Sequence, residues 1–264
     1  MAPRASALLF DLDETLMVEE PAAAAAFDAT AQLGAARCHL DATALAKAAR
    51  SQARELWYAA PTHEYCMRVG ISSWEGLWCR FEGNEPDAQA LREWSPAYRQ
   101  ETWRRALAEQ GIEDTVLAGE LAEQFGIERR ARHEVFADVA EALAELKESH
   151  SLALITNGAA CLQREKLAAS GLSDHFEAVV VSADLGVAKP DAAVFEHALR
   201  QLGVDGGQSV MVGDSIPKDI DGALAAGIGA IWLNRSGHPA PADRADLVEI
   251  ATLSDLPGAL DHRG

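Results

Sequence analysis

The carboxy-terminal half of the chain alternates between short apolar runs and segments with helical periodicity. The apolar runs occupy residues 152–155, 178–181, 209–212 and 229–233. The helical segments between them span about 160–170, 191–202 and 217–226. This alternation is typical of βαβ units, in which successive strands are parallel and a helix connects each pair. The pattern predicts an α/β fold with a doubly wound parallel sheet.

The segment from about Met17 to Arg132 has a different pattern. It is rich in Ala, Glu and Arg, and it lacks a β-branched run long enough for a convincing strand. The expected helices span 21–36, 42–59, 87–109 and 114–125. We therefore expect an inserted all-helical domain over 17–132, and a core domain built from 1–16 and 133–264. Five of the six tryptophans lie in the insert, where they either fill a helical core or form a substrate wall.

Composition narrows the choice of partner. The 264 residues carry 23 basic and 41 acidic side chains, a net charge of −18, which repels nucleic acid and anionic membranes. No stretch approaches the roughly 18 apolar residues of a membrane span. Neither CxxC spacing nor a paired His motif accompanies the cysteines, so reduced thiols are favoured over zinc sites or disulfides. We expect a cytoplasmic protein with a small-molecule substrate.

Reactive side chains follow several of the apolar runs. The segments are Asp11-Leu12-Asp13-Glu14-Thr15 after 7–10, Thr156-Asn157-Gly158 after 152–155, Lys189-Pro190 beyond 179–181, and Gly213-Asp214 after 210–212. In an open parallel sheet, ligands bind where the carboxyl ends of the strands meet, so these segments can share one pocket. A pocket with carboxylates, a hydroxyl, an amide and an ammonium suits phosphoryl transfer.

The acidic residues of this pocket allow covalent catalysis. Asp11 can attack phosphorus in line and become an aspartyl-phosphate, and Asp13 can protonate the leaving oxygen and later activate water. If these two residues share a cleft with Asp214 and Asp219, two charges 4 Å apart repel by about 4 kcal/mol at an effective dielectric near 20. Such a cluster needs a cation, and oxygen ligands favour Mg²⁺. The alternative for Asp11 and Asp13 is a pair of acidic residues in a turn. The alternative for Asp219 is that it merely stabilises the amino terminus of a helix.

The remaining polar residues suit phosphate binding. The Thr156 hydroxyl and the backbone N–H groups that open the next helix can cradle a phosphate, and Asn157 lies beside them. Lys189, one of five lysines in the chain, can place its charge on the phosphate and on Asp11. The alternatives are an ordinary Asn-Gly turn and a solvated surface lysine.

With these motifs together, the chain resembles the haloacid dehalogenase superfamily over its entire length. The resemblance implies that Asp11 is the nucleophile, Asp13 the general acid/base, and Thr156 and Lys189 the phosphate binders. It also implies that Asp214, supported by Asp219, and the main-chain carbonyl of Asp13 hold Mg²⁺. The helical insert resembles a C1-type cap that closes over the substrate. The motif spacing is most similar to the branch of sugar-phosphate and nucleotide phosphatases that includes N-acylneuraminate-9-phosphatase.

The expected function is therefore Mg²⁺-dependent hydrolysis of a small phosphate monoester, a sugar phosphate or a nucleotide, through an aspartyl-phosphate. Dehalogenation is disfavoured, because the 2-haloacid dehalogenases of the superfamily lack a carboxylate at the position of Asp13. A phosphomutase and a catalytically idle member that binds a metabolite or a partner protein stay open. The leaving group is expected to contact aromatic and basic residues of the insert. These are Arg68, Trp74 and Trp78, with Tyr65 and Arg80 beside them.

Overall fold

A computed structural model describes residues 5–242, 244 and 247–261 of the chain. The ends of the predicted core domain, residues 1–4 and 262–264, lie outside the described residues. The chain divides into two compact units. An α/β unit contains the described residues up to Val18, Val135–Asn157 and the residues from Lys166 onward, and a helical unit contains Glu19–Glu134 and Gly158–Glu165.

The α/β unit is built on a six-stranded sheet of order β5-β4-β1-β6-β7-β8. Every neighbouring pair in this sheet is parallel. The strands are β1 (Ala7–Phe10), β4 (Ser151–Thr156), β5 (Ala178–Val181), β6 (Ser209–Gly213), β7 (Gly229–Leu233) and β8 (Glu249–Ile250). The predicted doubly wound parallel sheet is confirmed. Two short strands, β2 (Met17–Val18) and β3 (Glu134–Val135), pair separately.

The register of the sheet brings the ends of β1, β4 and β6 level with one another. Phe10 pairs with Leu154 on one side and with Val212 on the other. The backbone N–H of Asp11 then donates to the carbonyl of Val212 at 3.1 Å. The residues that follow these strands therefore emerge at the same edge of the sheet.

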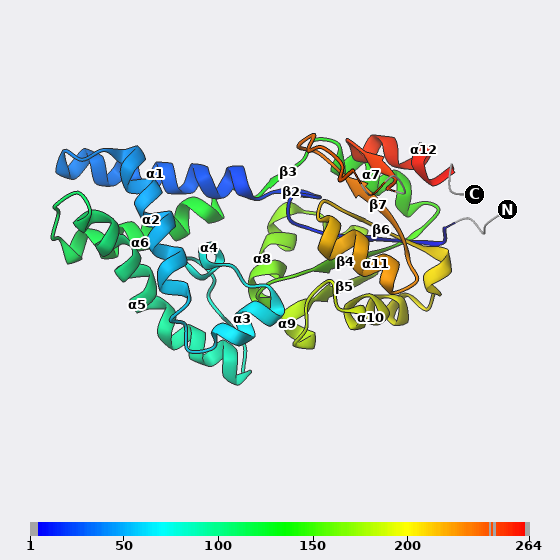
Figure 1. The fold of residues 1–264 in the computed structure, drawn as a ribbon, viewed down its shortest axis with the longest axis horizontal. Coiled ribbons are helices and arrows are strands. Elements are labelled where there is room, and N and C mark those ends of the chain that lie inside the picture. The colour runs from blue at the N-terminus through cyan, green and yellow to red at the C-terminus, as the bar shows by residue number, and fades with distance from the viewer. Residues whose placement is uncertain (1–4, 243, 245–246, 262–264) are drawn as a thin grey trace. The chain divides into compact units, whose positions relative to one another are not determined.

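Helices cover both faces of the sheet (Figure 1). Leu8 and Phe10 of β1 belong to one apolar core with residues of α7, α8 and α12, and Leu9 belongs to the opposite core with residues of α10 and α11. This division follows from the alternation of side chains along a strand. The helices of the unit are α7 (Val139–Lys147), α8 (Ala160–Ser170), α9 (Ser182–Leu185), α10 (Ala192–Leu202), α11 (Asp221–Ala225) and α12 (Leu256–Asp261), and the first residues of α8 group with the helical unit. Single turns of 3₁₀ helix span η1 (Ser173–His175), η2 (Gly206–Gln208) and η4 (Leu253–Asp255).

The predicted helix over 217–226 is divided in the structure. A π-helical turn, η3 (Ile216–Ile220), precedes the short helix α11. The wider turn puts Asp219 at a buried position, where its side chain accepts the N–H of Ser215 at 3.0 Å. A π-helical turn inside a helix is frequently a functional feature.

The helical unit has an aromatic core. Trp103 and Phe125 pack against Phe27, and Trp57 packs against Tyr98. Three of the five tryptophans of the insert, at positions 57, 78 and 103, are buried, as the core-filling interpretation expects. The helices are α1 (Glu20–Cys38), α2 (Ala42–Trp57), α3 (His63–Val69), α4 (Ser73–Gly76), α5 (Pro86–Ala108) and α6 (Thr115–Arg130), of which α3 and α4 were not expected.

The four cysteines are free thiols, and those at positions 79 and 161 approach one another to 3.6 Å between their sulfur atoms. Within the described residues, none of the helices has both the length and the apolar character needed to cross a bilayer.

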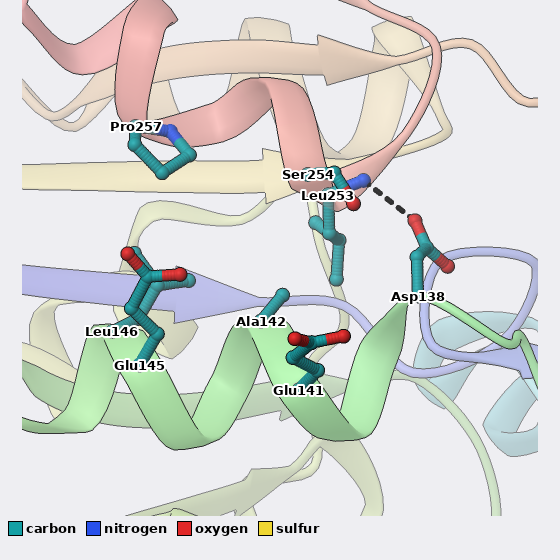
Figure 2. Close-up of a pocket in the computed structure, with 8 residues that line it drawn as sticks. All are labelled: Asp138, Glu141, Ala142, Glu145, Leu146, Leu253, Ser254 and Pro257. Atoms are coloured by element: carbon teal, nitrogen blue, oxygen red, sulfur yellow. Dashed lines mark hydrogen bonds between the residues drawn. The ribbon is translucent and has the colours of Figure 1, made fainter.

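The start of α7 anchors the carboxy-terminal segment of the α/β unit. Asp138 accepts the N–H of Leu253 at 2.7 Å and pairs with Arg235 at 3.0 Å. Beside this contact lies a pocket of about 240 Å³, where Glu141 and Glu145 of α7 face Ser254 and Pro257 (Figure 2). None of the predicted site residues lines this pocket.

Candidate active site

A buried lysine lies between two carboxylates at the carboxyl edge of the sheet. The Lys189 Nζ is 2.5 Å from Asp11 Oδ1 and 2.7 Å from Asp219 Oδ1. It also donates to the carbonyl of Ile155 at 2.9 Å. Asp11 itself is only 7% exposed. The ammonium therefore fixes the first carboxylate after β1 in a largely desolvated position.

Asn157 holds the backbone of this lysine. Its Oδ1 accepts the N–H of Lys189 at 2.9 Å, and its Nδ2 donates to the carbonyl of Lys189 at 3.1 Å. This paired contact links the end of β4 to the loop before α10. The sequence predicted a substrate contact for Asn157, and that contact stays a prediction. In the structure its amide contacts the backbone of Lys189. Thr156, the last residue of β4, is 1% exposed and lies at the same edge of the sheet.

Three carboxylates form a compact acidic group here. Asp11, Asp214 and Asp219 each offer one oxygen, and these oxygens lie within 4.8 Å of one another. The N–H of Asp214 donates to the Thr15 hydroxyl at 3.1 Å, and its carbonyl accepts the indole N–H of Trp232 at 2.8 Å. The neighbours of Asp214 thus fix its backbone while its carboxylate faces the other two.

The acidic group is electrostatically strained. Burial raises the pKa of Asp11 to about 8 although Lys189 opposes the shift, and the charges of Asp219 and Asp214 add to it. Burial and the charge of Asp219 raise the pKa of Asp214 to about 6. Burial acts to lower the pKa of Lys189, but Asp11 and Asp219 outweigh it and hold that pKa above its usual value. With all three carboxylates ionised, the site has more negative charge than one lysine neutralises.

This imbalance, together with the donor set, fits a hard divalent cation. The group offers only oxygen ligands, and Mg²⁺ prefers one or two carboxylates together with water and substrate phosphate. Both oxygens of Asp219 have a contact, Oδ1 with Lys189 and Oδ2 with the N–H of Ser215, whereas Lys189 contacts only Oδ1 of Asp11. Asp11 and Asp214 are consequently the better placed direct ligands, with Asp219 in a supporting position.

Asp13 lies outside the three-carboxylate group and has a partner of its own. The left-handed backbone of Glu14, with φ of 61°, turns the chain directly after Asp13. The Asp13 carboxylate meets the ammonium of Lys166, which is 3.1 Å from both of its oxygens. Sequence reasoning missed Lys166. The available signal was its spacing of four residues from Leu162, which places a charge on the buried face of α8.

The predicted leaving-group contacts lie in the helical unit and differ in exposure. Arg68 is exposed, with its guanidinium 5.7 Å from the ring centre of Tyr65, and Trp74 is half-buried below Arg50. Trp78 is only 1% exposed, and Arg129 and Arg130 lie over its ring. Its surroundings favour core packing over contact with a substrate.

Comparison with known proteins identifies the family. A sequence model described as a haloacid dehalogenase-like hydrolase matches residues 5–227. A phosphoserine phosphatase from Thermus thermophilus is 34% identical over 94% of this chain and 96% of its own length. The mouse N-acylneuraminate-9-phosphatase is 37% identical, over 50% of this chain and 54% of its own length. The chain therefore belongs to the haloacid dehalogenase-like hydrolases.

Solved structures agree with this assignment. A 2-haloacid dehalogenase from Pseudomonas syringae is 30% identical and superposes with a TM-score of 0.62, covering 98% of this chain and all of its own. The hydrolase YfnB from Bacillus subtilis, solved with magnesium bound, has a TM-score of 0.66 over 98% of this chain and all of its own. It is 22% identical, so that likeness concerns the fold alone.

Proposed function

We propose that this protein is a Mg²⁺-dependent phosphatase that hydrolyses a small phosphate monoester through a phosphorylated Asp11. The observation that carries the proposal is the buried Asp11 carboxylate, held by Lys189 within a group of three carboxylates at the sheet edge. Family membership and two relatives that are phosphatases by name support it.

The proposed reaction has two steps. An Asp11 oxygen attacks the phosphorus of the ester, the bond from phosphorus to the leaving oxygen breaks, and Asp13 gives its proton to that oxygen. Asp13, now a carboxylate, then takes a proton from water. The resulting hydroxide attacks the phosphorus of the aspartyl-phosphate, which releases inorganic phosphate and restores Asp11.

The other residues bind the phosphoryl group and hold its charge in place. The Lys189 ammonium, beside Asp11, supplies a point charge for a phosphate oxygen, and the Thr156 hydroxyl supplies a hydrogen bond. Asp11, Asp214 and the main-chain carbonyl of Asp13 would hold Mg²⁺, with Asp219 in support. When bound, the ion would neutralise charge on the phosphate and on the carboxylates.

The names of the relatives indicate which phosphate esters to test. A relative that spans nearly the whole chain is a phosphoserine phosphatase, so O-phosphoserine belongs first in a substrate panel. Sugar phosphates and nucleoside monophosphates complete it, since N-acylneuraminate-9-phosphatases and a pyrimidine 5'-nucleotidase match about half of the chain. The net charge of −18 favours such small substrates over nucleic acid. We also propose a cytoplasmic location, in keeping with four reduced cysteines.

A phosphate-release assay with this panel, with and without Mg²⁺, tests the proposal. We expect release of phosphate in equal amount to the dephosphorylated product, loss of activity with EDTA, and recovery with Mg²⁺. Asp11→Asn should reduce kcat by more than about a hundredfold, since a neutral amide is a poor nucleophile. Borohydride should convert residue 11 of the working enzyme to homoserine by reducing the acyl phosphate, which mass spectrometry detects.

Other outcomes would assign a different function. An isomerised ester without phosphate release would identify a mutase, and halide release from 2-chloropropionate would identify a dehalogenase. A folded protein that binds esters without turning any of them over would identify an idle member of the family. Full activity in metal-free buffer would contradict the role of Mg²⁺.

A further inference from the structure

A second buried lysine, Lys166, has no part in the chemistry described so far. Its side chain is 0% exposed, and its ammonium lies 3.1 Å from each oxygen of Asp13, whose side chain is 26% exposed. A buried ammonium is costly unless a partner compensates it, and removal of one partner of a buried pair is strongly destabilising. The contact is therefore a specific feature of the fold and differs from a mobile surface ion pair.

The backbone around Asp13 is also fixed. The N–H groups of Leu16 and Met17 donate to the carbonyl of Leu12, each at 2.9 Å, and the N–H of Glu14 donates to Met17 at 2.8 Å. This closed turn fixes the Cα of Asp13 directly after β1. The ammonium of Lys166, at equal distance from both oxygens, restrains the rotation of the Asp13 side chain.

We propose that Lys166 is a positioning residue that holds the Asp13 carboxyl group in the orientation needed for proton transfer to the leaving oxygen. The inference rests on the proposed function, in which Asp13 is the general acid. In this inference the two buried lysines have different roles. Lys189 holds the nucleophile Asp11, and Lys166 holds the acid/base Asp13.

The division of tasks has a measurable consequence for substrates. An alkoxide is a poor leaving group, so its departure depends on a well-placed proton donor, whereas 4-nitrophenolate leaves with little help. A well-placed general acid contributes about 10²- to 10⁴-fold to rate. A misplaced one should therefore slow the cleavage of alkyl phosphates selectively.

The experiment measures kcat/KM for glycerol 2-phosphate and for 4-nitrophenyl phosphate in the wild type, Lys166→Met and Lys166→Arg. We expect Lys166→Met to lower the value for the alkyl ester by about 10- to 100-fold more than the value for the aryl ester. Lys166→Arg, which retains the charge, should give an intermediate ratio. The ratio of the two values does not depend on how much of a preparation is folded. Lys147→Met, at an exposed position of α7, is the matched control and should leave the ratio unchanged.

A second comparison separates positioning from general damage to the site. In an Asp13→Asn background, loss of Lys166 should produce no further selective effect on the alkyl ester, because the group that it positions is already gone. A selective effect that persists in that background would overturn the inference.

The remaining outcomes distinguish this inference from the proposed function. If the wild type hydrolyses both esters and Lys166→Met reduces both equally, Lys166 is a structural residue and the inference alone is wrong. If the wild type releases phosphate from neither these esters nor the substrate panel, the proposed function fails and the inference fails with it.

Discussion

At the scale of single residues, the site is defined by how each charge is held. Lys189 contacts two carboxylates, and its own backbone is held on both sides by the amide of Asn157. Positions after the strands therefore combine reactive groups with residues whose task is to fix them. Such arrangements restrict the reactive groups to a narrow range of geometry.

Asn157 offers a direct test of that distinction. Asn157→Ala removes both hydrogen bonds to the backbone of Lys189, and a displacement of about 1 Å can cost roughly a hundredfold in rate. We expect kcat to fall by about 10- to 100-fold with little change in KM, measured by steady-state kinetics. Asn157→Asp retains only the acceptor, so its kcat should lie between those of the wild type and Asn157→Ala. A rise in KM with kcat intact would instead support the substrate contact predicted from the sequence.

The raised pKa of Asp11 predicts a pH dependence of stability in metal-free protein. The folded-state pKa is about 8 against an ordinary value of 3.8, so between these pH values the folded state keeps a proton that the unfolded state has lost. Stability should therefore fall as pH rises through this window. Thermal unfolding at pH 5 and pH 8 with EDTA measures the effect.

Asp11→Asn should remove the part of the pH dependence of stability that comes from Asp11. It should raise Tm at pH 8 by about 2–4 °C for each kcal/mol gained in the free energy of unfolding. Mg²⁺ should raise the Tm of the wild type more than that of the variant. Glu177→Gln, which changes an exposed carboxylate of the same unit, serves as the control and should leave the pH dependence as it is. The same slope in wild type and Asp11→Asn would contradict the prediction.

At the scale of elements, the strand ends determine which groups meet. β6 ends at Gly213, where a Cβ would lie 2.4 Å from Asp219 Oδ2. A glycine is thus required because the carboxylate of the π-helical turn packs directly against the strand. The turn and the strand end form one rigid support for the acidic group.

Gly213→Ala should displace Asp219 and weaken metal binding. We expect the Mg²⁺ concentration for half-maximal activity to rise by about tenfold, a magnitude typical of disturbed supporting residues at metal sites. Gly207→Ala is the matched control, because a Cβ there would meet nothing within 4 Å. An unchanged Mg²⁺ requirement in a folded Gly213→Ala variant would show that Asp219 does not support the ion.

The sequence patterns predicted the elements that have a clear period or a clear end. Apolar runs gave β1 and β4 to β7, so the residues after them were expected at one edge. Two features had no such signal. β8 has two residues, too few to show alternation. The contact between Lys166 and Asp13 joins positions 153 apart, and only the tertiary fold brings them together.

At the scale of the whole molecule, the helical unit is where substrate selection is predicted. Arg68→Ala and Trp74→Ala should change kcat/KM by roughly tenfold for some esters of the panel and little for others, with the Mg²⁺ requirement unchanged. Trp78→Ala should act differently, because its ring is buried. It should destabilise the unit by about 3–5 kcal/mol and reduce activity equally for all esters. Equal losses across the panel for Arg68→Ala would contradict its role in selection.

The central place of β1 has a consequence for synthesis. Its neighbours in the sheet, β4 and β6, lie beyond the whole helical insert in the sequence. At a translation rate of about 5–20 residues per second, the apolar strand that carries Asp11 waits on the order of 10 s for its second partner. Contacts within the helical insert can form in that interval. Among the interior strands of the described sheet, the strand before Asp11 therefore waits longest for its second neighbour.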